Sequence, residues 1–132
     1  MDNTRAAARV LVVDDQVDVI EVLIHILRKK PHYEVVTTTN PIEALDRVKA
    51  TRFDIVLSDV TMPEMRGTEL VGHIQVASPS TRIILMSGEG RPQVAPSVKI
   101  FGFLQKPIAA DQLLKTLDQA VADLHAAAPE TP

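Results

Sequence analysis

The sequence contains no cysteine and no tryptophan among its 132 residues. Without cysteine there can be no disulfide framework, no thiolate metal site and no cysteine nucleophile, and this absence fits a reducing compartment. Aromatic residues make up only 3% of the chain, so the core must be built from Val, Ile and Leu packed at interior density. Apolar residues at 45% and charged residues at 23% are typical of one globular domain.

A strong positive charge and long apolar runs are also missing. The formal net charge is -3, and the basic residues are scattered rather than interleaved with aromatics, so we expect no direct nucleic-acid binding by this chain. The first apolar run is too short for a signal sequence, and no later run is long enough to cross a bilayer. We therefore predict a cytoplasmic protein without a membrane partner.

Short apolar runs alternate with segments of helical periodicity along the chain. Strands are predicted where β-branched residues and leucines run together, over residues 10–13, 33–38, 54–58, 82–86 and 100–104. Helices are predicted where apolar residues recur every three or four positions, over residues 16–27, 42–50, 67–77 and 109–126. Asn40 and Pro41 have the pattern of an N-cap followed by proline at the first helical position.

Five strand and helix alternations predict the α/β class, as a doubly wound (βα)5 three-layer sandwich around a parallel five-stranded sheet. The common strand order is then 2-1-3-4-5, as in flavodoxin-like folds, and ligands bind beyond the carboxyl ends of strands one and three. The fourth helix should be shortened or irregular. Only 18 residues separate Ser87 from Lys106, and Pro92 and Pro96 interrupt that interval.

Polar side chains stand at the carboxyl ends of four of the five predicted strands. Asp14 and Asp15 follow the first strand, Asp59 the third, Ser87 the fourth and Lys106 the fifth. Because strands one and three are neighbours in the predicted order, their three carboxylates should crowd one crevice unless a cation intervenes. Carboxylate oxygens suit a hard cation such as Mg²⁺, which keeps several waters and binds through one or two carboxylates.

An ionised carboxylate at Asp59 is already a nucleophile and can attack a phosphoryl group to form an acyl phosphate. The ammonium of Lys106, the hydroxyl of Ser87 and Mg²⁺ would share the charge on the phosphoryl oxygens. Taken singly, each of these residues is more often a helix cap, a turn residue or a solvated surface residue. Their joint placement favours a phosphoryl-transfer site.

Four blocks of the sequence resemble the signature blocks of the receiver domain of two-component response regulators, especially the chemotaxis-regulator-like ones: VLVVDDQ, IVLSDVTMPEMRG, ILMSG and FLQKP. The resemblance extends roughly from Arg9 to Leu124. It implies a phosphorelay in which a sensor histidine kinase or a phosphotransfer protein passes a phosphoryl group to Asp59. It also implies a signalling switch that catalyses only its own phosphorylation and dephosphorylation, not an enzyme acting on a metabolite.

The resemblance also assigns the ligands of the metal and the phosphoryl group. Asp14, Asp15, Asp59 and the backbone carbonyl of Thr61 would bind Mg²⁺, with Asp14 acting through a metal-bound water. Lys106 would pair with a phosphoryl oxygen.

The same resemblance implies a conformational switch. Ser87 would move toward the phosphoryl group, and Phe103 takes the place of the aromatic residue that turns inward when this happens. Thr61 and Glu89 match variable positions that tune the lifetime of the phosphorylated state. The Lys106–Pro107 bond matches a cis peptide of the family. The family's usual output and dimer surface is built from the fourth helix, the fifth strand and the last helix.

We expect an N-terminal tail over residues 1–8, a receiver domain over 9–125 and a linker-like tail over 126–132. The tail sequence AAAPETP is compatible with a natural end and with a connection to further protein. The predicted partners are thus the phosphoryl donor, a downstream protein target or a covalently linked effector domain, and a second copy of the chain in a homodimer.

Two other hypotheses belong to different functional classes. A receiver-like scaffold would use the altered fourth-helix region for constitutive binding without phosphorylation. A magnesium-dependent phosphohydrolase with an aspartyl nucleophile is disfavoured, because Asp59 is followed by Val60 and Thr61 without the second acid that serves as acid or base in such enzymes. The intact set of acids favours the phosphorelay receiver over the scaffold.

Overall fold

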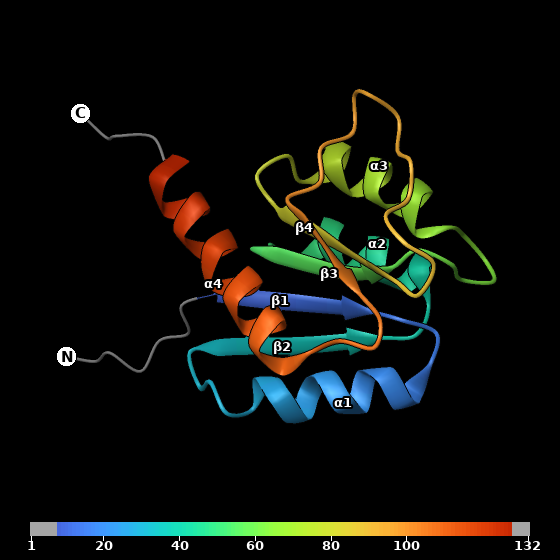
Figure 1. Ribbon diagram of the computed structural model, residues 1–132. Helices are drawn as coiled ribbons and strands as arrows, with labels where there is room; N and C mark the ends of the chain where they lie inside the picture. The colour runs from blue at the N-terminus through green and yellow to red at the C-terminus, as the bar shows by residue number, and fades with distance from the viewer. Residues whose placement is uncertain (1–7, 128–132) are drawn as a thin grey trace, which may run out of the picture.

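The computed structural model describes residues 8–127, which form a parallel five-stranded sheet between two layers of helices (Figure 1). The strands are β1 (Ala8–Val13), β2 (Tyr33–Thr38), β3 (Ile55–Asp59), β4 (Arg82–Ser87) and β5 (Gly102–Gln105). The helices are α1 (Val17–Leu27), α2 (Pro41–Ala50), α3 (Gly67–Ala77) and α4 (Ala110–Ala127). The strand order β2-β1-β3-β4-β5 confirms the predicted doubly wound α/β fold.

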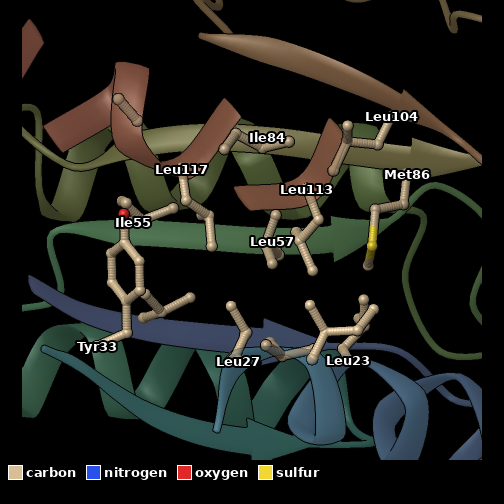
Figure 2. Close-up of a cluster of buried hydrophobic side chains, with 14 of the residues drawn as sticks. Leu23, Leu27, Tyr33, Ile55, Leu57, Ile84, Met86, Leu104, Leu113 and Leu117 are labelled. Carbon is tan, nitrogen blue, oxygen red and sulfur yellow. The ribbon is translucent and has the colours of Figure 1, made fainter. Parts of the chain in front are cut away.

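The sheet separates two apolar cores because successive side chains of a strand point to opposite faces. In β3, Ile55 and Leu57 pack with α1 and α4, whereas Val56 packs with α2 and α3. Figure 2 shows the first of these cores, in which leucines from both helices meet the aliphatic side chains of the central strands. Tyr33 closes one end of it and donates a hydrogen bond of 2.5 Å to Asp118 of α4.

Local sequence signals set several element boundaries. The side chain of Asn40 accepts hydrogen bonds from the backbone N–H groups of Ile42 and Glu43, at 2.8 and 3.2 Å, so the predicted N-cap is confirmed. Helix α3 has the predicted bounds. Asp59 and Ser87 are the last residues of their strands rather than the first residues after them.

The predicted tails extend mostly outside the described residues, which exclude 1–7 and 128–132. Ala8, expected in the N-terminal tail, is the first residue of β1. No helix within residues 8–127 is both long and apolar enough to span a bilayer; the cytoplasmic location stays a prediction.

The fourth helix of the expected pattern is absent rather than short. All of residues 88–101 are described, and none of them is helical. Pro92 and Pro96 lack the N–H groups that a helix would use, and Gly90 adopts a φ of 94°, which favours glycine. The chain instead runs beside α3 in turns and extended stretches (Figure 1). Strand β5 consequently begins at Gly102, two residues later than predicted.

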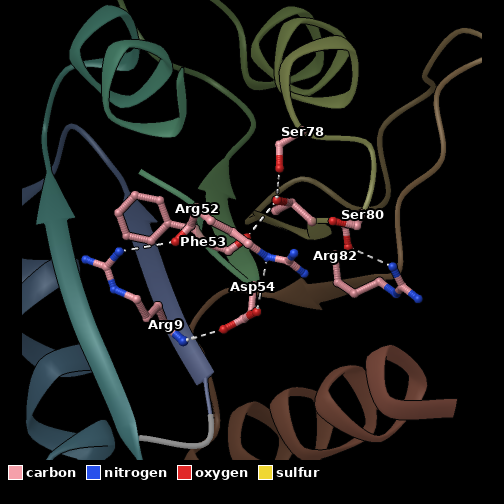
Figure 3. Close-up of polar contacts among 8 residues, drawn as sticks. Arg9, Arg52, Phe53, Asp54, Ser78, Ser80 and Arg82 are labelled. Carbon is pink, nitrogen blue, oxygen red and sulfur yellow. Dashed lines mark hydrogen bonds and ion pairs between the residues drawn. The ribbon is translucent and has the colours of Figure 1, made fainter. Parts of the chain in front are cut away.

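A polar network fixes the amino ends of the central strands (Figure 3). The Asp54 carboxylate accepts a hydrogen bond of 2.8 Å from the backbone N–H of Arg9 and lies 3.7 Å from the guanidinium of Arg52. Thr81 donates a hydrogen bond of 2.7 Å to the carbonyl of Phe53. The acid at this end of the sheet is therefore matched by basic and N–H groups.

Candidate functional site

Three carboxylates meet at the carboxyl edge of the sheet, as the strand order predicts. Strands β1 and β3 are neighbours with Val13 opposite Ser58, so Asp14 and Asp59 are adjacent in space. Carboxylate oxygens of Asp14, Asp15 and Asp59 lie within 4.8 Å of one another. Asp14 and Asp59 are buried, whereas Asp15 is exposed, so this acidic cluster is open to solvent on one side.

Asp14 is held rigidly at the base of the cluster. Its side chain is fully buried, and Oδ1 accepts a hydrogen bond of 2.9 Å from the backbone N–H of Gln16, the residue that precedes α1. The backbone N–H of Asp14 donates to the carbonyl of Thr38 at the end of β2, at 3.2 Å. With the main chain and Oδ1 fixed, Oδ2 is left to face the interior of the site.

Lys106 brings the fifth strand into the cluster. Its Nζ donates a hydrogen bond of 2.9 Å to Asp14 Oδ2 and lies 3.1 Å from Asp59 Oδ1. Burial alone would lower the pKa of Lys106, but the hydrogen bonds and charges of Asp14 and Asp59 outweigh it and raise that pKa above its usual value. The ammonium therefore stays charged at neutral pH. The predicted cis peptide between Lys106 and Pro107 is confirmed.

The charge balance of the cluster is negative. Burial, followed by the charge of Asp14, raises the pKa of Asp59, and the hydrogen bond and charge of Lys106 offset only part of this rise. Within residues 8–127, Asp14 and Asp59 share the ammonium of Lys106, and the third acid, Asp15, has no ion pair with it. An oxygen-only donor set with surplus negative charge and one solvent-facing side fits Mg²⁺, which retains waters when it binds to proteins.

The loop after β3 depends on a glycine that sequence analysis did not single out. A Cβ atom on Gly67 would lie 2.1 Å from the carbonyl oxygen of Asp59 and 2.9 Å from the Cα of Val60. Instead, the N–H of Gly67 donates a hydrogen bond of 2.7 Å to the Val60 carbonyl, and Ser58 Oγ donates to the Asp59 carbonyl at 3.0 Å. The start of α3 is thereby packed directly on the backbone of Asp59. The sequence signal that could have indicated this close approach was the glycine at the predicted start of a helix.

Ser87 lies at the same edge of the sheet. It is buried at the end of β4, directly after Met86, which is the register partner of Asp59. Ser87 Oγ accepts a hydrogen bond of 2.9 Å from the backbone N–H of Glu89, and the Ser87 carbonyl accepts one of 2.9 Å from the backbone N–H of Lys106. The predicted hydroxyl, ammonium and carboxylates therefore lie at the carboxyl ends of four neighbouring strands, on one edge of the sheet.

Two further predicted site residues, Thr61 and Phe103, are not part of the acidic cluster. Thr61 is exposed in the loop two residues after Asp59, and its role as a carbonyl ligand stays a prediction. Phe103 of β5 is half-buried and packs against the core on the side of α2 and α3, and its role in a switch also stays a prediction.

Comparisons with known proteins agree with this geometry. The family model described as "Response regulator receiver domain" matches residues 10–118. The chemotaxis protein CheY of Listeria monocytogenes is 31% identical over 115 residues, which are 85% of this chain and 97% of that protein. The transcriptional regulatory protein ZraR of Escherichia coli is 32% identical over 126 residues, 93% of this chain but 28% of that longer protein. The structure of the chemotaxis response regulator CheY4 of Vibrio cholerae superposes with a TM-score of 0.77 at 36% identity, covering 86% of this chain and 98% of that one.

Proposed function

The chain belongs to the response regulator receiver domain family, and from this premise we propose that Asp59 is the residue that accepts the phosphoryl group. Receiver domains are the signalling switches of two-component systems, not enzymes that turn over a metabolite. The observation that carries the assignment is the position of Asp59, whose carboxylate lies within 4.8 Å of two other acids and 3.1 Å from the ammonium of Lys106.

The surroundings of the three acids distinguish their roles. Asp14 is fully buried, and each of its carboxylate oxygens already has a donor, from Gln16 and from Lys106. Asp15 points to the solvent side of the cluster. The exposed fraction of Asp59 is 7%, and one of its carboxylate oxygens contacts Lys106. Asp59 is therefore accessible to a phosphoryl donor and has a cation beside an oxygen that would react. This difference supports Asp59 as the nucleophile and the other two acids as metal ligands.

The proposed reaction needs no general base. An oxygen of the Asp59 carboxylate forms a bond to phosphorus, and the bond from phosphorus to the donor atom breaks, with the electron pair leaving on the donor. Lys106 would pair with one phosphoryl oxygen, and the hydroxyl of Ser87 would donate to another. Mg²⁺, held by Asp14, Asp15, Asp59 and the Thr61 carbonyl, would neutralise charge on the carboxylates and the phosphoryl group. Hydrolysis of the acyl phosphate would reset the switch.

Phosphorylation would replace the single negative charge of the Asp59 carboxylate with about two negative charges on the acyl phosphate, carried by three phosphoryl oxygens at one edge of the sheet. Those charges would draw Ser87 toward Asp59 and allow Phe103 to turn inward, changing the surface around β5. The physiological donor in this proposal is a phosphohistidine on a sensor kinase or phosphotransfer protein. The changed surface would act on a downstream protein, a linked effector domain or a second copy of the chain.

Incubation with Mg²⁺ and acetyl phosphate, followed by intact mass measurement, tests this function. The wild type should gain the mass of one phosphoryl group, and the gain should disappear when the metal is chelated. Asp59→Asn should remain unmodified, whereas Asp46→Asn should react like the wild type, because Asp46 is exposed on α2, away from the acidic cluster. A wild type that gains no mass would refute the proposal and favour the scaffold hypothesis, which the complete acid set does not otherwise support.

A further inference from the structure

The missing helix leaves backbone groups after Ser87 without their usual partners. In a helix, each carbonyl accepts a hydrogen bond from the N–H four residues later. No residue from 88 to 101 is helical, so the carbonyl of Gly88 cannot be satisfied in this way. It accepts a hydrogen bond of 3.1 Å from the side-chain Nε2 of Gln105, the residue before Lys106. A side-chain amide thus satisfies the carbonyl of Gly88.

A second glutamine holds the far end of the same segment. The side chain of Gln75 on α3 donates from Nε2 to the carbonyl of Ser97 and accepts at Oε1 from the backbone N–H of Lys99, both at 2.7 Å. The segment is therefore fastened near each end by one amide side chain. Only the contact of Gln105 lies next to Ser87, so only this glutamine is placed to affect the reaction.

One peptide unit connects Gln105 with the hydroxyl of Ser87. The carbonyl of Gly88 and the N–H of Glu89 belong to the same planar peptide group. Gln105 holds the carbonyl end of that plane, and the N–H end donates a hydrogen bond of 2.9 Å to Ser87 Oγ. A rotation of the peptide would break both contacts at once. The amide of Gln105 consequently fixes the direction of the donor that holds the Ser87 oxygen.

We propose that Gln105 is a positioning residue, which orients the Gly88–Glu89 peptide and thereby holds the Ser87 hydroxyl ready for the phosphoryl group on Asp59. This inference rests on the proposed function of Ser87 and Asp59. The adjacent residue Lys106 acts on the same turn, because its backbone N–H donates to the Ser87 carbonyl at 2.9 Å. The last residue of β5 thus supports the hydroxyl, and the next residue, Lys106, supplies the ammonium.

The test compares Gln105→Met, which keeps the length of the side chain but removes the donor, with Gln105→Lys, which restores a nitrogen donor. Gln119→Met is the matched control, because Gln119 is exposed on α4 and its side chain makes no hydrogen bond within residues 8–127. Gln105 is itself exposed, so all three variants should fold with similar Tm. Two quantities are measured, the rate of acetyl phosphate modification with Mg²⁺ and the hydrogen-exchange rate of the Glu89 amide.

Gln105→Met should be phosphorylated about twofold to tenfold more slowly than the wild type, the range expected for loss of one neutral hydrogen bond. Its Glu89 amide should exchange faster, while Gln105→Lys should recover most of the rate and Gln119→Met should match the wild type. If Gln105→Met reacts as fast as Gln119→Met, the positioning role is wrong although the proposed function stands. If the wild type gains no phosphoryl group, the proposed function is refuted, and so is the positioning role of Gln105, which rests on it.

Discussion

At the scale of single residues, the central feature is a carboxylate kept where its charge is unfavourable. The pKa of Asp59 is raised by burial and by Asp14, so the folded protein binds its proton more tightly than the unfolded chain does. As the pH rises above the usual aspartate pKa, the unfolded chain loses this proton while the folded protein still binds it. Between that pH and the raised pKa of the folded protein, the free energy of unfolding therefore decreases as the pH rises. Above the raised pKa the full penalty is present. In the proposed function, this loss of stability would accompany the placement of a nucleophile at Asp59.

Because burial and Asp14 disfavour the charge of Asp59, we predict that Asp59→Asn is more stable than the wild type at neutral pH without metal. Removing this penalty should raise Tm, because the amide carries no charge for burial and Asp14 to disfavour. The difference should shrink as the pH falls toward the usual aspartate pKa, because the wild-type carboxyl is then protonated. Thermal unfolding at several pH values measures it, and Asp46→Asn is the control. A lower Tm for Asp59→Asn at neutral pH would contradict the charge balance described for the cluster.

The same residues predict the effect of the metal on stability. Binding of Mg²⁺ to the folded state alone should stabilise the wild type, by about 1.4 kcal/mol at a concentration ten times Kd. Asp59→Asn and Asp14→Asn each remove a proposed ligand and should lose most of this gain, whereas Asp46→Asn should keep it. Unfolding curves recorded with increasing Mg²⁺ at constant ionic strength test the site independently of any phosphoryl transfer. Equal gains in all four proteins would show that the acids are not ligands.

At the scale of elements, the start of α3 is coupled to the backbone of Asp59 through Gly67. Gly67→Ala places a Cβ 2.1 Å from the Asp59 carbonyl oxygen, so α3 must shift, and we expect a loss of about 1–3 kcal/mol. Gly72 in the same helix is the matched control, because its Cβ would meet nothing closer than 3.9 Å. Gly72→Ala should gain about 0.5–1 kcal/mol from helix propensity. Urea unfolding compares the two, and similar effects at both positions would refute the close-approach explanation.

The two glutamines at the ends of the helix-free segment should have separable effects. Gln75→Met removes the contacts to Ser97 and Lys99, so the Lys99 amide should exchange faster and stability should fall by about 1 kcal/mol. Phosphorylation by acetyl phosphate and exchange of the Glu89 amide should not change, because this end of the segment does not touch Ser87. A slower phosphorylation in Gln75→Met would mean that the segment acts as one unit rather than through its two ends.

Some features of the helices, strands and connecting segments could be predicted from the sequence, and others could not. The cap at Asn40 and the bounds of α3 follow from local patterns, and the meeting of Asp14 with Asp59 follows from strand order. The path of residues 88–101 does not, because it is fixed by side-chain contacts of Gln75 and Gln105 with backbone 17 to 24 positions away. Prolines predict where a helix fails, but they do not predict which side chains replace its hydrogen bonds.

At the scale of the whole molecule, the two edges of the sheet are organised differently. At the amino edge, Asp54 is paired with the backbone of Arg9 and the side chain of Arg52 (Figure 3). At the carboxyl edge, three acids lie close together and two of them, Asp14 and Asp59, share the ammonium of Lys106. Helices cover both faces (Figure 1), so the acidic cluster opens only along the edge. In the proposed function, a phosphoryl donor would therefore approach Asp59 from this edge.

Chemical mapping of the modified residue tests the central claim most directly. Hydride reduction of an acyl phosphate releases phosphate and converts the aspartate to homoserine, which peptide mass mapping locates without relying on a substitution. After treatment with Mg²⁺ and acetyl phosphate, the conversion should occur at Asp59 and not at Asp14 or Asp15. Conversion at either of those two acids, or a phosphorylated protein without homoserine at position 59, would contradict the assignment of Asp59 as the phosphoryl acceptor.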